Sequence, residues 1–483
     1  FQRLCPAGGL EAGVRVAGAA LRVGGVHGHL AGQKSLLQRG VGLHRNAQLL
    51  AGGQQLLFNA ADLIVVGWFS GSDSVAAVGA TSALTNLIVN LFIGLSLGAG
   101  VAVAQGIGAK NDKLTSEAVH TAIPVAAISG IFLTVIGVLF SRNFLELMGT
   151  PDGKLLRLAS VYMQLYFAGM TFSMIYNFGS AILRAAGDTR SPLIFLTIAG
   201  VLNVILNIVF VALFKLDVAG VALATSISQA VSAVLVLRAL IKRQDECRFE
   251  FKKMYIHKSA LLRMARIGVP AGLQGSLFSI SNVLIQSSVN SFGAAHMSGS
   301  AAASSIEGFC YVTMNSFHQT ALNFCGQNYG AGDFKRVKRI TWVCLMTVAV
   351  AGFVVGNLSY IFGRELLGIY ITDSPEAINY GMERLKFMVV PYFLCGIMDT
   401  TTGSMRGIGS SVIPMIITVV GVCVMRIVWI YTVFALPQYH TFSGLFISYP
   451  ISWLLTFAAL FISFITVMRH KEKKIKALKE AAS

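Results

Sequence analysis

The stretch VAVAQGIGA at residues 101–109 has a counterpart 222 residues further along the chain, NFCGQNYGA at residues 323–331, in which the glutamine, the second glycine and the alanine recur. The same shift places RAAGDTRSP (184–192) on RGIGSSVIP (406–414), with the arginine, a glycine and the proline again in register. No gap is needed between these matches. The chain therefore contains two copies of one structural unit.

The composition is too apolar for a water-soluble protein. Hydrophobic residues make up 55% of the 483 residues and charged residues only 12%, whereas soluble domains carry about a quarter charged residues. The mean hydropathy is +0.69. The apolar residues form runs of about 20, the length that crosses a bilayer as a helix. Soluble and disordered classes are excluded, and continuous runs argue against the alternating strands of an outer-membrane barrel.

Twelve apolar segments are predicted between residue 54 and the C-terminus. Six of them separate the two copies, an even number, so both copies have the same orientation. We expect an all-α membrane protein with twelve transmembrane helices in two six-helix lobes related by a parallel repeat; transporters built this way bind substrate between their lobes. The segments lie near 54–70, 83–106, 119–140, 160–183, 191–213, 218–240, 261–290, 300–325, 340–363, 382–405, 412–434 and 443–468.

Charge sets the predicted orientation and the domain limits. The net charge is +17, and the connections after even-numbered segments are basic, Arg406 following the tenth. Because cytoplasmic loops retain Lys and Arg, this balance indicates topology and not nucleic-acid binding. We expect a multi-pass protein of the cell membrane with both termini in the cytoplasm. Its parts are an N-terminal lobe (54–240), a cytoplasmic linker (241–260), a C-terminal lobe (261–468) and a basic tail (469–483).

Residues 1–53 differ from the rest of the chain. They are rich in glycine and arginine. No uninterrupted apolar stretch among them is long enough for the core of a secretory signal. We expect this segment to be disordered or to result from a shifted reading frame.

No motif of an enzyme is present. The sequence lacks a phosphate-binding GxxxxGK[ST] loop, an HExxH pair and a GxSxG elbow. The seven cysteines form no CxxC pair, which argues against a disulfide framework or a metal site. We expect a protein without catalytic residues, bound metal, cofactor or obligatory protein partner, which lies in the lipid bilayer.

Acidic residues inside predicted segments are the sharpest functional signal. They are Asp62 in the first segment, Glu307 in the eighth and Asp399 in the tenth. A charge at the bilayer centre costs about 2.5–3.5 kcal/mol on insertion scales, and such residues usually face a cavity or a partner. Asp62 is the strongest candidate for binding a proton or a metal cation. The competing interpretation is a structural hydrogen bond to a neighbouring helix.

Neutral polar residues in the fifth and sixth segments could assist an ion. Asn203 and Asn207 are four residues apart, hence on one helical face, and Thr225 is a weaker candidate. Interhelical hydrogen bonding explains these residues equally well. Gly94, Gly98 and Gly100 are interpreted as helix-packing contacts. The aromatic residues Phe309, Tyr311 and Phe317 either line a path for organic cations or face lipid.

From about Gln54 onward the chain resembles the multidrug and toxic compound extrusion (MATE) family. The resemblance rests on FNAADLIVVG (58–67), LRAAGDTRSP (183–192), LNVILN (202–207), IGVPAGLQ (267–274) and SMRGIG (404–409), together with the two helix ends quoted above. It implies two V-shaped lobes and multidrug efflux, the export of organic, often cationic compounds in exchange for Na⁺ or H⁺.

The resemblance also assigns roles to residues. Asp62 falls on the ion-coupling acid, and Asn203 and Thr225 match a polar cluster of the N-terminal lobe, with Asn177 nearby. Asn207 stands where some members carry a second aspartate. Residues 271–290 lack the acid that one subfamily has in its seventh helix, so Glu307 or Asp399 would have to serve in the C-terminal lobe.

Two other functions remain open. One is a flippase for lipid-linked precursors, a related branch in which several Arg or Lys hold pyrophosphate; the inner segments here look nearly free of basic residues. The other is a non-transporting scaffold or receptor, which the paired repeats and intramembrane acids disfavour.

Overall fold

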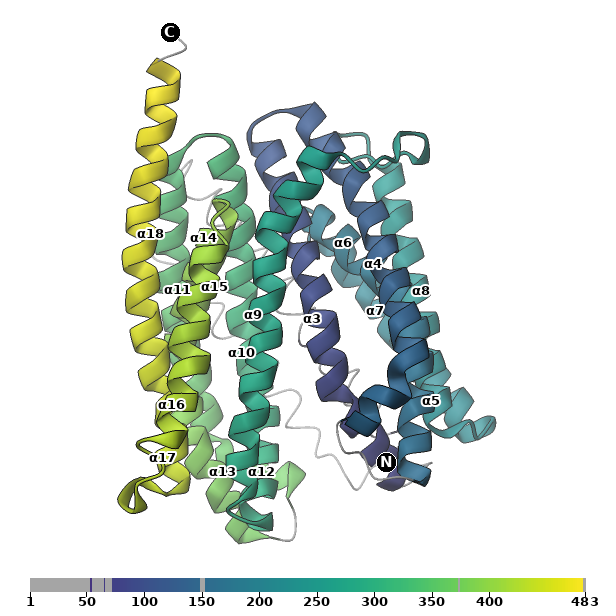
Figure 1. Cartoon of the computed structure of the whole chain (residues 1–483), viewed down its shortest axis with the longest axis vertical. Coiled ribbons are helices and arrows are strands. Elements are labelled where there is room, and N and C mark those ends of the chain that lie inside the picture. The colour runs from purple at the N-terminus through teal and green to yellow at the C-terminus, as the bar shows by residue number, and fades with distance from the viewer. Residues whose placement is uncertain (1–52, 54–64, 66–71, 148–152, 372–373, 481–483) are drawn as a thin grey trace.

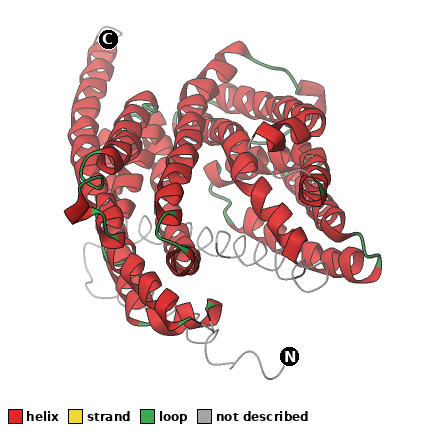
Figure 2. Cartoon of the chain, turned by 60° about the horizontal axis from the view of Figure 1, so that its bottom comes forward, coloured by secondary structure: helices red, strands yellow, loops and turns green. Residues whose placement is uncertain are grey.

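The computed structural model describes residues 53, 65, 72–147, 153–371 and 374–480. Every regular element in these ranges is a helix (Figure 2). The helices form two groups that meet in the upper half of Figure 1 and diverge toward its lower edge. Apart from Val65, the first predicted segment (54–70) and Asp62 lie outside the described residues, as do residues 1–52.

The first group of helices, called the N-lobe below, covers the second to sixth predicted segments. Its α7 continues directly into a π-helical stretch, η1. The elements are α3 (Ser72–Gly108), α4 (Asp112–Leu147), α5 (Lys154–Ala168), α6 (Met170–Ala185), α7 (Arg190–Asn207), η1 (Ile208–Leu213) and α8 (Asp217–Lys242).

The second group, called the C-lobe, follows the linker between α8 and α9, which contains the short η2 (Phe251–Lys253). Its helices cover the seventh to twelfth predicted segments. They are α9 (Lys258–Asn290), α10 (Ala294–Gly330), α11 (Phe334–Ile361), α12 (Gly363–Tyr370), α13 (Pro375–Met388), α14 (Tyr392–Gly407), α15 (Val412–Thr418), η3 (Val419–Val424), α16 (Met425–Tyr431), η4 (Pro437–Tyr439), α17 (Phe442–Phe446) and α18 (Ser448–Glu480).

The helix boundaries confirm the sequence repeat. Shifted by 222 residues, the limits of α3 coincide with those of α10, and the limits of α6 with those of α14. Each copy is also interrupted at the same place. The α5–α6 pair bends by 46° at Gly169, and α13 and α14 are interrupted around Pro391, which is Gly169 shifted by 222. The two lobes are therefore copies in structure as well as in sequence.

Most of the helices have the length and composition of membrane spans. Seven helical stretches in the described ranges meet both criteria, and the bent pair of α5 and α6 would make an eighth. Neither α9 nor α10 is among them, although they contain 33 and 37 residues. Both carry many Ser, Asn and Gln residues. Polar residues in membrane helices usually face the bundle interior or a cavity, which suits helices at the centre of the molecule (Figure 1).

Glycines bring α3 of the N-lobe against α9 of the C-lobe. A Cβ atom at Gly94 would overlap the backbone of Gly272, and one at Gly98 would overlap the carbonyl oxygen of Met264. Such close approach of backbones is the usual role of small residues in membrane helix pairs. The predicted packing role of Gly94 and Gly98 is confirmed, and this contact joins the two lobes.

Two details differ from the sequence prediction. Arg406 was expected in a loop, but it lies within α14 and is only 5% exposed. The last helix was expected to end near 468, yet α18 continues to Glu480, so the described part of the basic tail extends the span as a helix.

The α3–α9 contact predicts the effect of one added methyl group. We expect Gly98→Ala to destabilise the protein by about 1–3 kcal/mol, the usual cost of overpacking, because backbone occupies the space. Gly368→Ala makes the same change in helix α12, where no atom lies within 4 Å of the new Cβ; there the helix propensity of alanine should stabilise by up to about 1 kcal/mol. Thermal unfolding in detergent measures both, and equal melting temperatures would contradict the packing.

Candidate functional site

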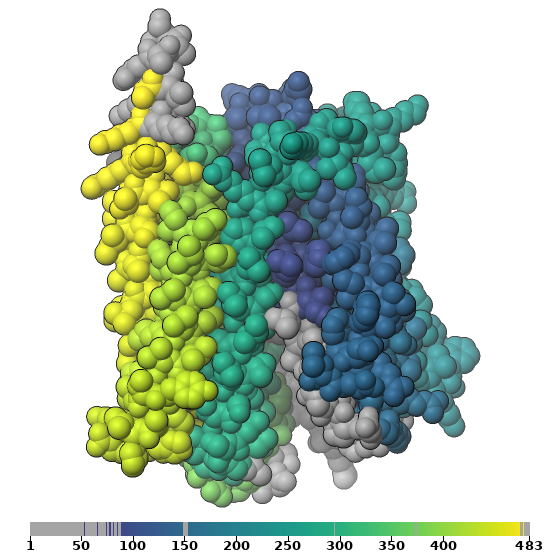
Figure 3. Space-filling model, viewed as in Figure 1, coloured from purple at the N-terminus to yellow at the C-terminus, as the bar shows by residue number. Residues whose placement is uncertain are grey.

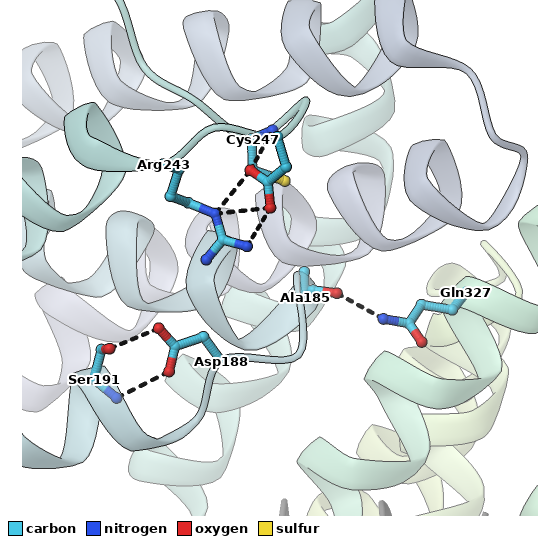
Figure 4. Close-up of polar contacts among 7 residues, drawn as sticks. Ala185, Asp188, Ser191, Arg243, Cys247 and Gln327 are labelled. Carbon is cyan, nitrogen blue, oxygen red and sulfur yellow. Dashed lines mark hydrogen bonds and ion pairs between the residues drawn. The ribbon is translucent and has the colours of Figure 1, made fainter.

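The two lobes are joined at one end by a pair of equivalent hydrogen bonds. Gln105 at the end of α3 donates its amide to the carbonyl oxygen of Gly407 at the end of α14, over 2.9 Å. Gln327 at the end of α10 donates to the carbonyl oxygen of Ala185 at the end of α6, over 2.7 Å (Figure 4). The 222-residue shift relates both donors and both acceptors. We call these two bonds the interlobe latch.

Two glycines let the latch close. A Cβ atom at Gly108 would overlap the carbonyl oxygen of Gln327, and one at Gly330 would overlap that of Gln105. Each latch glutamine therefore lies against the helix end of the other lobe. The glycines of these two helix ends are therefore required for the contact between lobes.

The latch lies at the end of the molecule that carries the basic connections, called the basic end below. Here α18 supports it through Lys471, whose ammonium group donates to the carbonyl oxygen of Ile408 over 2.6 Å and lies 4.7 Å from the centre of the Tyr329 ring. Ile408 follows the latch acceptor Gly407, and Tyr329 follows the latch donor Gln327 by two residues. A lysine from the tail helix thus holds the C-lobe half of the latch.

The linker between the lobes is fixed to the same end. The Arg243 guanidinium donates to both carboxylate oxygens of Asp245 (Nε to Oδ1, 2.9 Å), and this hydrogen bond lowers the pKa of the Asp245 carboxyl (Figure 4). Burial raises the pKa of the neighbouring Cys247 thiol to about 12. At neutral pH the linker therefore carries a closed ion pair and a protonated, buried thiol.

A buried histidine of α4 anchors the linker to the N-lobe. His120 accepts a hydrogen bond at Nε2 from the backbone N–H of Glu250 (3.1 Å), so its Nδ1 is the donor to the carbonyl oxygen of Ser116 (2.8 Å). Phe249, which is fully buried, stacks on the ring at 5.6 Å. The linker is thus packed on α4 and does not hang freely between the lobes.

Inside the N-lobe, three of the predicted site residues form one chain of hydrogen bonds. The Asn207 amide donates to Asn203 Oδ1 over 3.2 Å, and the Asn203 amide donates to Thr225 Oγ1 over 3.3 Å. Asn203 is 6% exposed and Asn207 is completely buried. The chain ties α7 to α8 with neutral oxygen and nitrogen atoms. This arrangement could accept a cation without adding a fixed charge of its own.

The backbone around this polar chain is irregular. The π-helical stretch η1 begins directly after Asn207, and π-turns in helices are frequent at functional sites. Ser226, next to Thr225, donates to the carbonyl oxygen of Leu165 over 2.9 Å and packs against Gly169, where α5 and α6 bend. The polar chain therefore adjoins two places where the helices depart from regular geometry.

The remaining N-lobe candidates are placed differently. Asn177 donates to the carbonyl oxygen of Ser173 in its own helix over 2.9 Å, so the structure does not join it to the polar chain. Asp62 lies outside the described residues. Val65, three residues further along the chain, is buried in one cluster with Val211 and Val221. Those two valines belong to η1 and α8, the elements next to Asn207 and Thr225.

In the C-lobe, Glu307 of α10 has a cationic partner. Its carboxylate lies 3.0 Å from Nη2 of Arg384 in α13, and the same guanidinium donates to Ser300 and lies 5.0 Å from the centre of the Phe446 ring. Arg384 is 9% exposed. No sequence pattern indicates this pair, because its two members are far apart in the chain. An acid already paired with a buried arginine is poorly suited to bind an ion.

Asp399 of α14 lies beside a histidine. Its backbone carbonyl accepts a hydrogen bond from Nδ1 of His318 in α10 (2.8 Å), and the carboxylate Oδ1 lies 4.0 Å from the same nitrogen. About two turns further along α14, Arg406 donates to Gln274 of α9 over 2.8 Å. Glu307 and Asp399 thus have separate partners and do not form one site by direct contact.

The three aromatic residues predicted to line a path lie in different environments. Phe309 and Tyr311 are about half exposed, whereas Phe317 is buried in the C-lobe core. Phe317 is therefore a packing residue. Within the described ranges, no group of three or more His, Cys, Asp or Glu residues could hold a metal ion.

Comparisons with known proteins agree with this architecture. The MatE family model matches residues 53–209 and 270–432. The chain is 25% identical over 433 residues to the probable multidrug resistance protein YoeA of Bacillus subtilis, covering 88% of this chain and 92% of the relative. It is 26% identical over 378 residues to the probable multidrug resistance protein YpnP of the same organism, covering 78% and 84%.

A solved structure shows the same fold. It is the outward-facing conformation of a multidrug resistance MATE family transporter, which superposes with a TM-score of 0.82 at 21% sequence identity and covers 91% of this chain and 96% of that one.

The latch predicts how the lobes respond when its donors are lost. Gln105→Leu with Gln327→Leu keeps the size of both side chains and leaves two helix-end carbonyls without their donors. One hydrogen bond contributes about 0.5–1.5 kcal/mol, so each loss should favour separation of the basic end by roughly twofold to tenfold. Distances between nitroxide labels at Lys113→Cys and Lys335→Cys, in a background without native cysteines, report this separation.

Gln286→Leu is the matched control, because Gln286 bonds only within its own helix and is exposed. We expect its distance distribution to equal that of the parent protein. If the double latch variant also keeps the parent distribution, the two glutamines do not hold the lobes together.

Proposed function

The chain belongs to the MatE family of membrane transporters, and on this premise we propose that it is a secondary antiporter that exports organic, often cationic compounds in exchange for Na⁺ or H⁺. The relatives named as probable multidrug resistance proteins support this class of substrate. A transporter of this kind needs no catalytic residue and no cofactor besides its coupling ion. Small organic molecules and the bilayer would be its partners.

The observation that carries the coupling proposal is the buried chain of Asn207, Asn203 and Thr225. Hard cations take oxygen ligands, and amide and hydroxyl oxygens supply them without charge. We assign the one negative charge of the site to Asp62. The family resemblance supports this assignment, and Val65, three residues further along the chain, packs beside η1 and α8.

In the proposed mechanism two cations, the coupling ion and the drug, compete for one negative charge. When Na⁺ or H⁺ neutralises Asp62, the site no longer attracts a cationic drug, which leaves. Rearrangement of the Asn203–Thr225 bond would alter how α7 packs on α8, next to the bend at Gly169. One elementary charge moving through 100 mV supplies about 2.3 kcal/mol, enough to export a neutral compound against a gradient of nearly fifty-fold.

The latch gives the proposed cycle its gate. Basic connections are retained in the cytoplasm, so we assign the basic end to the cytoplasmic side and the diverging end in Figure 1 to the outside. In this assignment the latch closes the cytoplasmic side of a cell-membrane protein. Inward opening requires that the Gln105 and Gln327 bonds break.

A lipid-linked precursor flippase is the second candidate, because the inner segments are less poor in basic residues than the sequence suggested. Arg384, Arg406 and Arg426 are all buried in the C-lobe. Each has a partner within that lobe, however: Arg426, for example, donates to Ser452 over 3.0 Å and lies over the Tyr449 ring. Binding of an undecaprenyl-linked sugar, without transport of cationic dyes, would favour this function.

Asp62→Asn tests the coupling acid. We expect loss of ion-driven export of a fluorescent cation from vesicles, because the neutral side chain cannot alternate between charged and loaded states. Sodium and pH gradients imposed separately identify the ion. Asp112→Asn, an exposed acid at the basic end, should transport normally. Unimpaired export by the Asp62 variant would refute its assignment.

Asn203→Ala tests the polar chain. Loss of one hydrogen-bonding ligand, about 1.5 kcal/mol at most for a neutral group, should raise the ion concentration for half-maximal export by up to roughly tenfold while the protein stays folded. Asn357→Ala is the control, because it removes the same amide in α11, where Asn357 donates to the carbonyl oxygen of Phe353 and not to the polar chain. Equal ion dependence of the two variants would exclude Asn203 from the ion site.

A further inference from the structure

An apolar groove runs between α11 and α18 at the edge of the C-lobe, where the two helices stand side by side in Figure 1. Its volume is about 420 Å³, within the range of small-molecule sites. Its walls include Trp342, Leu345, Phe461 and Ile465, and Lys338 and Arg469 stand at its upper end. None of these residues belongs to the transport site described above.

The groove opens toward the membrane. Trp342 is 55% exposed and Ile465 is more than a third exposed, although both lie in helical stretches with the composition of membrane spans. The rings of Trp342 and Phe461 meet edge to face across the groove at 5.9 Å. Because both walls are apolar over this depth, the occupant must present hydrocarbon along the groove.

The upper end of the groove is cationic. Lys338 forms an ion pair of 2.8 Å with Glu472, which neutralises one charge, and Arg469 is exposed beside it. Three further cations of the first turns of α11 are exposed close by: Lys335, Arg336 and Arg339. Space-filling atoms of α18 form the edge of the molecule up to this end (Figure 3). The excess of positive charge selects an anionic head on the hydrocarbon occupant.

We propose that this groove binds an anionic glycerophospholipid of the cytoplasmic leaflet. An acyl chain lies along Leu345, Phe461 and Ile465, and the phosphate lies between Lys338 and Arg469. Basic pockets between helices on the cytoplasmic side are suited to such head groups. A zwitterionic lipid would pack against the apolar walls but would not neutralise the cations at the upper end. A soluble anion would neutralise the cations but would leave the apolar walls without a packing partner.

Trp342 supplies a direct readout. The protein is reconstituted in phosphatidylcholine vesicles with a minor fraction of phosphatidylglycerol brominated near the head group, or the same fraction of brominated phosphatidylcholine. The fluorescence of Trp342 is the difference between the parent and Trp342→Phe. We expect the anionic brominated lipid to quench it at a several-fold lower mole fraction, since one cation near the membrane surface contributes roughly fivefold in lipid affinity.

Variants separate the groove from general surface charge. Lys338→Gln with Arg469→Gln should abolish the preference. Leu345→Phe, which adds bulk to the groove without a second tryptophan, should reduce quenching while the cations remain. Because Lys338 also pairs with Glu472, Arg469→Gln alone, which keeps that pair, should lose part of the preference. Lys252→Gln with Lys258→Gln removes two exposed cations elsewhere and should preserve it.

Three outcomes would overturn the proposal. Equal quenching by both brominated lipids would mean that the head group is not selected. An equal loss in the Lys252 and Lys258 control would mean that only the net charge of the surface matters. Abolition of the preference by inorganic phosphate would mean that a soluble anion occupies the cationic end.

Discussion

The two latch hydrogen bonds close the basic end of two lobes that already pack backbone to backbone along α3 and α9. The last carbonyl groups of any helix lack a partner within that helix, and here the ends of α6 and α14 find donors on the opposite lobe, in Gln327 and Gln105. Each lobe thus supplies the donor for one helix-end carbonyl group of the other lobe. Together they contribute only a few kcal/mol, which is enough to hold one state and small enough to be reversed in a transport cycle.

The two lobes are alike in fold but bury different kinds of polar side chain. The C-lobe buries arginines beside acids and hydroxyls, as in the pair of Arg384 and Glu307, and such pairs are costly to break because each partner would be left charged and alone. The described N-lobe site holds a neutral chain from Asn207 to Thr225. Neutral hydrogen bonds exchange at lower cost, which is consistent with the proposal that an ion binds and leaves in the N-lobe.

Much of the fold could be predicted from the sequence, because helix length, apolar runs and the 222-residue repeat are local or periodic signals. The repeat even places the break at Pro391 on that at Gly169. Pairing across distant helices has no such signal. The sequence therefore placed Arg406 in a loop, although Gln274 holds it inside the C-lobe, and it missed His318 beside Asp399. Asn177 was grouped with Asn203 by family resemblance, yet it bonds within its own helix.

Helix α18 extends beyond its apolar span and reaches the latch at the basic end. A tail in water would gain nothing from continuing as a helix past residue 468, because isolated helical turns are marginal. This one is held by Lys471 on Ile408 and by Glu472 on Lys338, on neighbouring positions of one turn. Lys471 thus faces the latch, and Arg469, two residues earlier, faces the groove. A lipid anion at Arg469 would stabilise the turn that supports the latch. In the proposed orientation, the charge of the cytoplasmic leaflet and the closure of the proposed gate would therefore act on the same helix.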